Sequence, residues 1–335
     1  MTSTSMSDFS ATLPSQQDSM TSVFTTPPLT LSQAHVLNIC FTAGYVLPLY
    51  FTKYTRLSFS TYQEARPSPE RSRNDPAVIK ARLLSVTLST ILSCYAIHHI
   101  INLEETEEPF FTRFHATALR LGLMLKVEDA LAYLVTPALF LGPLYARFIG
   151  HELPFMRNWS VRTHILNIFG TWQGARNFII GPVSEELVWR SCVIAGYHLA
   201  GASRAFLIFF TPVSFGSAHF HHAWETYNRL GRNRDAFRVA IISTLFQFTY
   251  TTLFGFHCAF LFLRSSSVFP PMVAHVFCNL MGVPQLSSEV RQYAHRAKQI
   301  KVMYVLGIFA YIYGMRNWTL APGSFFWNAW TSRAW

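Results

Sequence analysis

Charged side chains are scarce in this chain of 335 residues, in which Asp, Glu, Lys and Arg make up 13% of the total. A soluble domain carries about 25%, whereas half of this chain is hydrophobic and 16% is aromatic. So few charges exclude a large soluble core and predict a polytopic membrane protein. The formal net charge of +10 comes from basic residues in loops between apolar runs. That pattern is typical of membrane orientation, so no nucleic-acid partner is expected.

Patterns that would define a disulfide framework or a signal peptide are also missing. Residues 1–33 are rich in Ser, Thr and Pro and contain no Lys or Arg, so we expect a disordered tail there and no signal peptide. Residues 319–335 are expected to be a short tail without a cysteine for prenylation. The five cysteines form no CxxC pair and no Cys/His metal spacing, which favours buried small hydrophobes: Cys40, Cys94, Cys192, Cys258 and Cys278.

Long apolar runs predict an all-α fold with about eight transmembrane helices. A full span needs about 20 residues, and the fifth, seventh and eighth runs are shorter. Loops rich in Lys and Arg alternate with loops poor in them, so the positive-inside rule places the basic set in the cytosol and both termini on the other side. The runs are 34–51, 78–101, 128–148, 177–200, 204–220, 237–263, 267–281 and 302–315.

Three charges interrupt the fourth run, where residues 184–190 read Ser-Glu-Glu-Leu-Val-Trp-Arg. Ionisable groups at membrane depth are costly, usually paired and by default functional. Glu186 and Arg190 are four residues apart and share a helix face, so they can pair. Glu185 lies about 100° around the helix and can face a cavity, where a desolvated carboxylate suits a general base. The alternative is that both acids only clamp neighbouring helices.

Two later runs contribute polar groups at a similar predicted depth. His219 ends the fifth run, where Gly216 permits close helix packing. His275 and Asn279 in the seventh run are four apart and share a face, as two hydrogen-bond donors of an oxyanion hole would. A carboxylate, imidazoles and an amide would then meet on the cytosolic side and suit hydrolysis by an activated water. Taken singly, each of these residues could instead serve interhelical bonding.

Zinc is an alternative to metal-free hydrolysis. Glu185, His219 and His275 are residue types that bind this metal. However, no pair of histidines flanks a glutamate on one helix, as in the common zinc-peptidase motif. The residue types alone therefore leave zinc open.

At these positions the chain resembles the type II CAAX prenyl endopeptidases, the Ras-converting enzyme family, in its eukaryotic branch. The resemblance covers roughly residues 35 to 285 and includes three family motifs in order. Glu-Glu-x-x-x-Arg, Phe-x-x-x-His and His-x-x-x-Asn are matched by Glu185, Glu186, Arg190, Phe215, His219, His275 and Asn279.

The resemblance implies a glutamate-dependent intramembrane endopeptidase without a metal or other cofactor. Residues 34–318 would form its transmembrane protease domain. Its substrates would be prenylated CAAX proteins such as small GTPases, from which it removes the last three residues. It would act in the endoplasmic reticulum membrane, in contact with lipid, with a catalytic cavity open to the cytosol. The alternatives are a related intramembrane protease with non-prenylated substrates and a non-catalytic membrane scaffold or transporter.

The resemblance also implies a role for each motif residue. Glu185 and His219 would activate a water. His275 and Asn279 would stabilise the oxyanion. The supporting residues would be Glu186 and Arg190.

Overall fold

The computed structural model describes residues 27–58, 72–102, 109–125, 127–321 and 324–327, and all regular secondary structure in these ranges is helical. The predicted all-α class is therefore confirmed for this part of the chain. The expected N-terminal tail lies mostly outside the described residues. Its last three residues, 31–33, already belong to the first described helix.

The α-helices are joined by short connections and by single 3₁₀ or π segments, which carry the label η. The α-helices are α2 (Leu31–Val46), α3 (Pro48–Phe51), α4 (Pro76–Ile101), α5 (Phe110–Arg120), α6 (Val135–Leu139), α7 (Leu141–Ile149), α8 (Asn167–Phe169), α9 (Trp172–Gly174), α10 (Gly181–Glu186), α11 (Ile194–Leu199), α12 (Arg204–Phe209), α13 (Thr211–Ser217), α14 (His221–Arg229), α15 (Arg234–Ser265), α16 (Phe269–Met281), α17 (Leu286–Gln292) and α18 (Ala297–Asn317). The other segments are η1 (Val127–Leu134), η2 (Arg162–Leu166), η3 (Ala175–Ile180), η4 (Leu187–Val193), η5 (Ala218–Phe220) and η6 (Ala294–Arg296).

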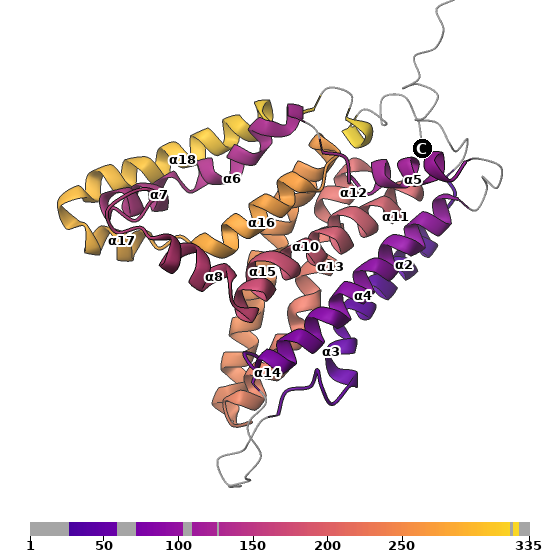
Figure 1. Ribbon diagram of the computed structural model, residues 1–335, viewed down its shortest axis with the longest axis horizontal. Helices are drawn as coiled ribbons and strands as arrows, with labels where there is room; N and C mark the ends of the chain where they lie inside the picture. The colour runs from indigo at the N-terminus through magenta and orange to yellow at the C-terminus, as the bar shows by residue number, and fades with distance from the viewer. Residues whose placement is uncertain (1–26, 59–71, 103–108, 126, 322–323, 328–335) are drawn as a thin grey trace, which may run out of the picture.

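The helices form two groups that meet along α16 (Figure 1). One group consists of α6, α7, α17 and α18, which contact one another. The other contains α2, α4, α10, α11, α13 and α15. The polar groups singled out in the sequence belong to this second group and to α16, so the fold brings them to the same part of the molecule.

Within the described ranges, three helices are long and apolar enough to cross a membrane: α2 with α3 over Leu31–Phe51, α4, and α15. A fourth crossing is possible if the pair Ala130–Leu139 and Leu141–Ile149, bent by 72°, is one broken span. The bend falls in the third predicted run, which contains two prolines, residues that interrupt helical hydrogen bonding. The chain is thus a multi-pass helical membrane protein. Eight crossings stay a prediction, since length and composition identify three or four.

Residues 175–199 form one uninterrupted helical run through η3, α10, η4 and α11. This run corresponds to the fourth predicted segment. Its bonding widens to π turns on both sides of the α-helical turn that carries Glu185 and Glu186. Pro182 has no N–H to donate to the preceding turn. Single π segments inside helices occur frequently at functional sites.

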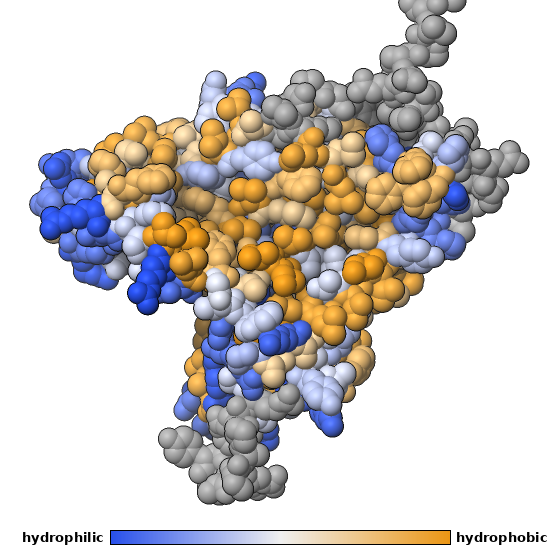
Figure 2. Space-filling view, in the orientation of Figure 1, coloured by the Kyte–Doolittle hydropathy of each residue, from blue (hydrophilic) through white to orange (hydrophobic). Residues whose placement is uncertain are grey.

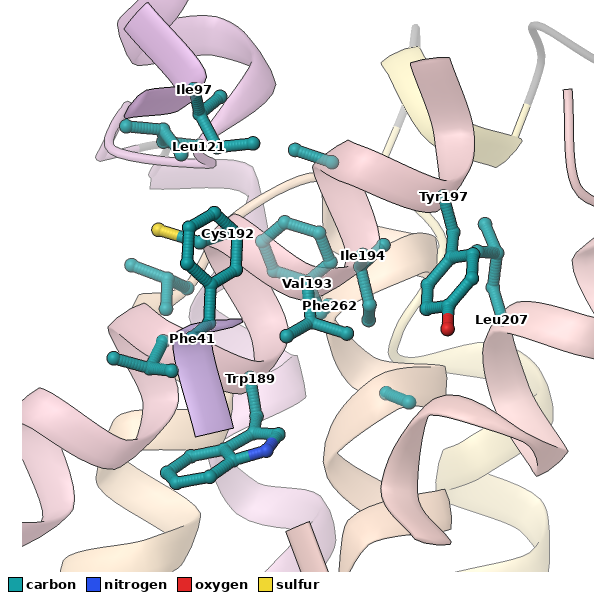
Figure 3. Packing of buried hydrophobic residues seen from close by; sticks show 14 of the residues in the cluster. Phe41, Ile97, Leu121, Trp189, Cys192, Val193, Ile194, Tyr197, Leu207 and Phe262 are labelled. Atoms are coloured by element: carbon teal, nitrogen blue, oxygen red, sulfur yellow. The ribbon is translucent and has the colours of Figure 1, made fainter. Parts of the chain in front are cut away.

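The C-terminal half of this run is the centre of the hydrophobic core. Trp189, Ile194 and Tyr197 are at most 2% exposed, and side chains from α2, α4 and α15 pack around them. Figure 3 shows how these side chains interlock. Its labelled members are Phe41, Ile97, Leu121, Trp189, Cys192, Val193, Ile194, Tyr197, Leu207 and Phe262.

Small residues let α13 and α15 approach closely. A Cβ atom on Gly255 would lie 2.5 Å from the Cβ of Pro212, and one on Gly216 would meet the hydroxyl of Thr252. Close approach at glycine is a common way for membrane helices to pack, because lipid supplies little hydrophobic driving force between them. The close packing expected at Gly216 is therefore confirmed, and it fixes α13, which ends at Ser217, two residues before His219.

Large apolar side chains also cover much of the outer surface. Leu92 on α4, Ile242 and Phe246 on α15, and Phe309 on α18 are each more than 60% exposed. Figure 2 shows extended apolar patches on one face, with polar groups gathered toward the ends of the molecule. Exposed apolar surface of this extent suits contact with lipid.

The five cysteines are free. Burial is confirmed for Cys192, Cys258 and Cys278, and Cys94 is half-buried. The expectation of burial is wrong for Cys40, which is exposed on α2 because it points away from the core that the same helix covers with its other face.

The described part of the C-terminal segment is packed. Phe326 is fully buried against the Phe262 ring at 5.0 Å. Its N–H donates to the Ser266 hydroxyl at 3.0 Å, and the Ser324 hydroxyl donates to the Leu263 carbonyl at 2.9 Å. These bonds attach residues 324–326 to the end of α15, so this part of the expected C-terminal tail completes the core.

Candidate active site

A cavity of about 480 Å³ opens between the central run and helices α2, α4, α13, α15 and α16. Glu185, His219, His275 and Asn279 all line it. These residues come from three segments far apart in the sequence. The structure therefore brings the three sequence motifs to a single cavity.

Glu186 lies behind the cavity wall, fully buried, with a basic group at each carboxylate oxygen. Its Oε2 forms an ion pair with Arg190 Nε at 2.9 Å, and its Oε1 accepts a hydrogen bond from His275 Nδ1 at 2.7 Å. The pair predicted from the i,i+4 spacing is thus present. His275 is a second partner, which the sequence did not reveal because it is 89 residues away.

Glu185 faces the cavity on the other side of His275. Its Oε2 lies 3.8 Å from His275 Nε2, and its side chain is 23% exposed. A carboxylate oxygen only accepts hydrogen bonds, so the bond to Glu186 places a proton on Nδ1 of the imidazole. His275 is therefore held between two carboxylates, with Nε2 directed toward Glu185.

His219 is held by the backbone of its own turn. Its Nδ1 lies 2.9 Å from the Phe215 carbonyl oxygen, which can only accept, so Nδ1 carries the proton. In the neutral ring, Nε2 then has a lone pair. Phe215 also lies under the Arg190 guanidinium, 4.4 Å from it, in a cation–π contact. The Phe-x-x-x-His spacing thus fixes the tautomer of His219 through the residue four positions earlier.

Asn279 is exposed at the cavity and anchored to the central run. Its Nδ2 donates to the Asn177 carbonyl oxygen at 2.8 Å. An amide nitrogen carries two hydrogens, so a second N–H remains for another acceptor. The side chain both ties α16 to η3 and keeps one donor.

Sequence reasoning missed the basic residues of the cavity wall. Arg73, Arg82 and Arg176 line it, but in the sequence they count only as charges of cytosolic loops. The available signal was the position of Arg82 inside an apolar run. Its guanidinium is buried and lies 3.3 Å from Glu225 Oε1.

Glu225 on α14 does not line the cavity but contacts two residues that do, Arg82 and His222. It accepts from Tyr50 at 3.3 Å and lies 3.4 Å from His222 Nδ1. Burial opposes its ionisation, but the contact with His222 and the charge of Arg82 outweigh burial and lower its pKa to about 2. Glu225 therefore stays negative at physiological pH.

A metal-binding geometry occurs beside the motif residues. His221, His222 and Glu225 each offer a ligand atom, and these atoms lie within 4.8 Å of one another. Within the described part of the chain, Glu185, His219 and His275 do not form such a group. In the cluster on α14, Arg82 and Tyr50 occupy one carboxylate oxygen of Glu225, and a nearby guanidinium opposes a bound cation.

A family model and several curated proteins match this chain. The family model described as "Type II CAAX prenyl endopeptidase Rce1-like" matches residues 167–281. The "Probable CAAX prenyl protease 2" of Schizosaccharomyces pombe is 34% identical over 277 residues, covering 82% of this chain and 92% of that protein. The "CAAX prenyl protease 2" of Homo sapiens is 30% identical over 250 residues, 71% of each chain. That of Caenorhabditis elegans is 28% identical over 249 residues, 72% of this chain and 86% of that protein. No solved structure matches significantly.

The buried ion pair makes a stability prediction. Replacing Arg190 with Met leaves the Glu186 charge buried without its guanidinium, so we expect the free energy of unfolding to fall by about 3–5 kcal/mol. Reversible unfolding in mixed micelles measures this quantity. The double variant Glu186→Gln/Arg190→Met should lose less than Arg190→Met alone, because no uncompensated charge remains.

Arg238→Met is the matched control, since Arg238 is 65% exposed in a surface pair. We expect a change within about 0.5 kcal/mol for it. If Arg190→Met and the double variant lose the same free energy of unfolding, Arg190 does not compensate the Glu186 charge.

Proposed function

Because the chain belongs to the type II CAAX prenyl endopeptidase family, it is a protease of prenylated CAAX proteins, and we propose that Glu185 and His219 activate the water that cuts off the last three residues. One observation carries this assignment: Glu185 and the acceptor-ready His219 line the same cavity. The Glu186–Arg190 pair lies behind the wall. Glu185 is therefore the motif carboxylate that a water in the cavity can reach.

Proton transfer follows from the tautomers. Glu185 takes a proton from the water while the lone pair on Nε2 of His219 accepts a hydrogen bond from the same water and orients it, and the resulting hydroxide attacks the scissile carbonyl. The same groups return the proton to the leaving amine. General acid–base catalysis of this kind contributes about 10²- to 10⁴-fold in rate.

The oxyanion needs donors on the opposite side of the carbonyl. We assign this role to Nε2 of His275 and the second amide hydrogen of Asn279. When His275 carries a proton on both nitrogens, its charge and that of Arg190 balance the two carboxylates, so the four groups sum to zero. Glu186 and Arg190 support catalysis by holding His275 in place.

We propose that the protease works without a metal. The contacts of Glu186 and Phe215 occupy Nδ1 of His275 and of His219, and the residues assigned to catalysis do not form the close ligand group seen around His222. Hydrolysis then depends on the protein's own base and donors.

The proposed location is the endoplasmic reticulum membrane, with eight crossings and the cavity open to the cytosol. The alternation of basic and basic-poor loops supports this orientation. The position of three arginines on the cavity wall agrees with it. A prenyl chain partitions into hydrocarbon while the peptide arrives from the cytosol, so a cavity reached from both phases suits the substrate.

The central prediction concerns Glu185. We expect Glu185→Gln to lower kcat/KM for a farnesylated CAAX peptide by at least about 10²-fold, because the amide cannot act as a base. Asp235→Asn is the matched control, since it makes the same change at a side chain that is 86% exposed. Undiminished cleavage by Glu185→Gln would rule out the assigned base. Equal cleavage of an unprenylated peptide would favour a related protease with other substrates.

Metal independence is tested by removing metal. Dialysis against a strong chelator should leave the rate of peptide cleavage unchanged, and added Zn²⁺ should not raise it. Metal analysis of the purified protein accompanies the assay. Activity that is lost to the chelator and restored by Zn²⁺ would contradict the metal-free mechanism.

Orientation is tested by cysteine labelling in sealed microsomes. Arg232 lies in the short connection between α14 and α15 and is exposed, so Arg232→Cys should react with a membrane-impermeant maleimide from the cytosolic side. Arg316 is exposed near the C-terminal end of α18. Arg316→Cys should react only after permeabilisation. The reverse pattern would invert the topology.

A further inference from the structure

Three arginines on the cavity wall have no part in the mechanism above. Arg73, Arg82 and Arg176 share this wall with Glu185. The guanidinium of Arg82 already has protein partners. Its Nε donates to the Thr55 carbonyl at 2.8 Å, and both terminal nitrogens lie 3.3 Å from Glu225 Oε1. Its charge is largely compensated, so Arg82 serves the structure of this wall.

Arg176 differs because its bonds go to neutral acceptors. Its Nε donates to Asn177 Oδ1 at 2.8 Å, its Nη1 to the Arg73 carbonyl at 2.7 Å and its Nη2 to Asn74 Oδ1 at 3.3 Å. A guanidinium has five N–H groups, so one remains on each terminal nitrogen. The three bonds hold the side chain in place without compensating its charge.

Positive charge therefore exceeds negative charge at this end of the cavity. Among the described residues, Arg73, Arg82 and Arg176 contribute +3, and Glu225, which pairs with Arg82, contributes −1, a surplus of two. Arg73 and Arg82 repel the charge of Arg176, and Glu225 attracts it. Among the residues that the structure describes, no carboxylate forms an ion pair with Arg176. An anion entering the cavity would meet this surplus.

The distance along the central run suits one particular anion. Arg176 precedes Glu185 by nine positions in the continuous helical run 175–199, or about 13 Å at 1.5 Å per residue, and somewhat less where the turns are π. Three extended residues span about 10 Å. A peptide cut three residues from its end thus places its terminal carboxylate near Arg176 when the scissile bond is at Glu185.

We propose that Arg176, assisted by Arg73, binds the terminal α-carboxylate of the substrate, and that its separation from Glu185 sets the length of the released tripeptide. The proposal rests on the proposed function and adds a substrate-binding site to it. A planar guanidinium with an N–H on each terminal nitrogen matches a carboxylate in a bidentate arrangement. The fixed α-carboxylate is the one anion that every substrate with a free C-terminus shares, whatever its last side chain.

The experiment compares two farnesylated peptides of one sequence, ending in a free carboxylate or in a carboxamide, with the full chain in lipid nanodiscs. We expect the unmodified protein to prefer the carboxylate by about tenfold to hundredfold in kcat/KM, the range of a hydrogen-bonded charge. Arg176→Gln should bring the ratio toward one, mainly by slowing cleavage of the carboxylate peptide. Arg176→Lys, which keeps the charge and loses the planar geometry, should retain part of the preference.

Two further variants separate recognition from folding. Arg176→Gln also removes bonds to residues 73 and 74, so Arg73→Gln serves as a second test, because the structure records no hydrogen bond or ion pair for that exposed side chain. It should reduce the preference more weakly. Arg238→Gln, at an exposed position on α15, should leave the ratio unchanged.

The outcomes distinguish this proposal from the function on which it rests. Glu185-dependent cleavage of both peptides at equal rates by the unmodified protein would overturn the arginine site alone. So would a full carboxylate preference in Arg176→Gln. Equal loss of activity on both peptides in Arg176→Gln would assign the residue to the fold and overturn the binding role. Absence of cleavage of any prenylated peptide would overturn the proposed function together with this site.

Discussion

The arrangement of the site depends on one buried carboxylate. Glu186 is fully enclosed and must be compensated where it lies, because an unpaired charge in a medium of low dielectric costs several kcal/mol. Arg190 and His275 supply that compensation at 2.9 and 2.7 Å. Arg190 in turn stacks on Phe215, whose carbonyl fixes the ring of His219. Two imidazoles on different helices are thus oriented through a group that does not itself reach the cavity.

This arrangement divides the cavity electrostatically. The Glu185 end has carboxylates and imidazoles suited to proton transfer, and the end at Arg176 has surplus positive charge. A substrate with a lipid at one point and a free carboxylate a few residues away meets both ends at once. Binding and chemistry are then parts of one charge pattern along a single helical run.

Local spacing predicted local contacts correctly. Glu186 and Arg190 pair because four residues return a helix to the same face, and Gly216 allows close packing because it lacks a side chain. Prediction from apolar length was less complete. A run of apolar residues reveals its hydrophobicity but not the direction of its helix, and at Phe140 the third run bends by 72°. The exposure of Cys40 shows the same limit, since composition does not say which helix face meets lipid.

The sequence by itself determined the all-α class, the family, the motif residues and the pairing within one helix, because each depends on residue type and on spacing within a few turns. Tertiary structure decided the rest. It joined His275 to Glu186 across 89 residues, and it brought Arg176 and Arg73 to the wall that Glu185 shares. In the sequence these arginines are indistinguishable from other loop charges. Their meaning depends on which groups lie nearby, and only the packing of distant helices fixes that.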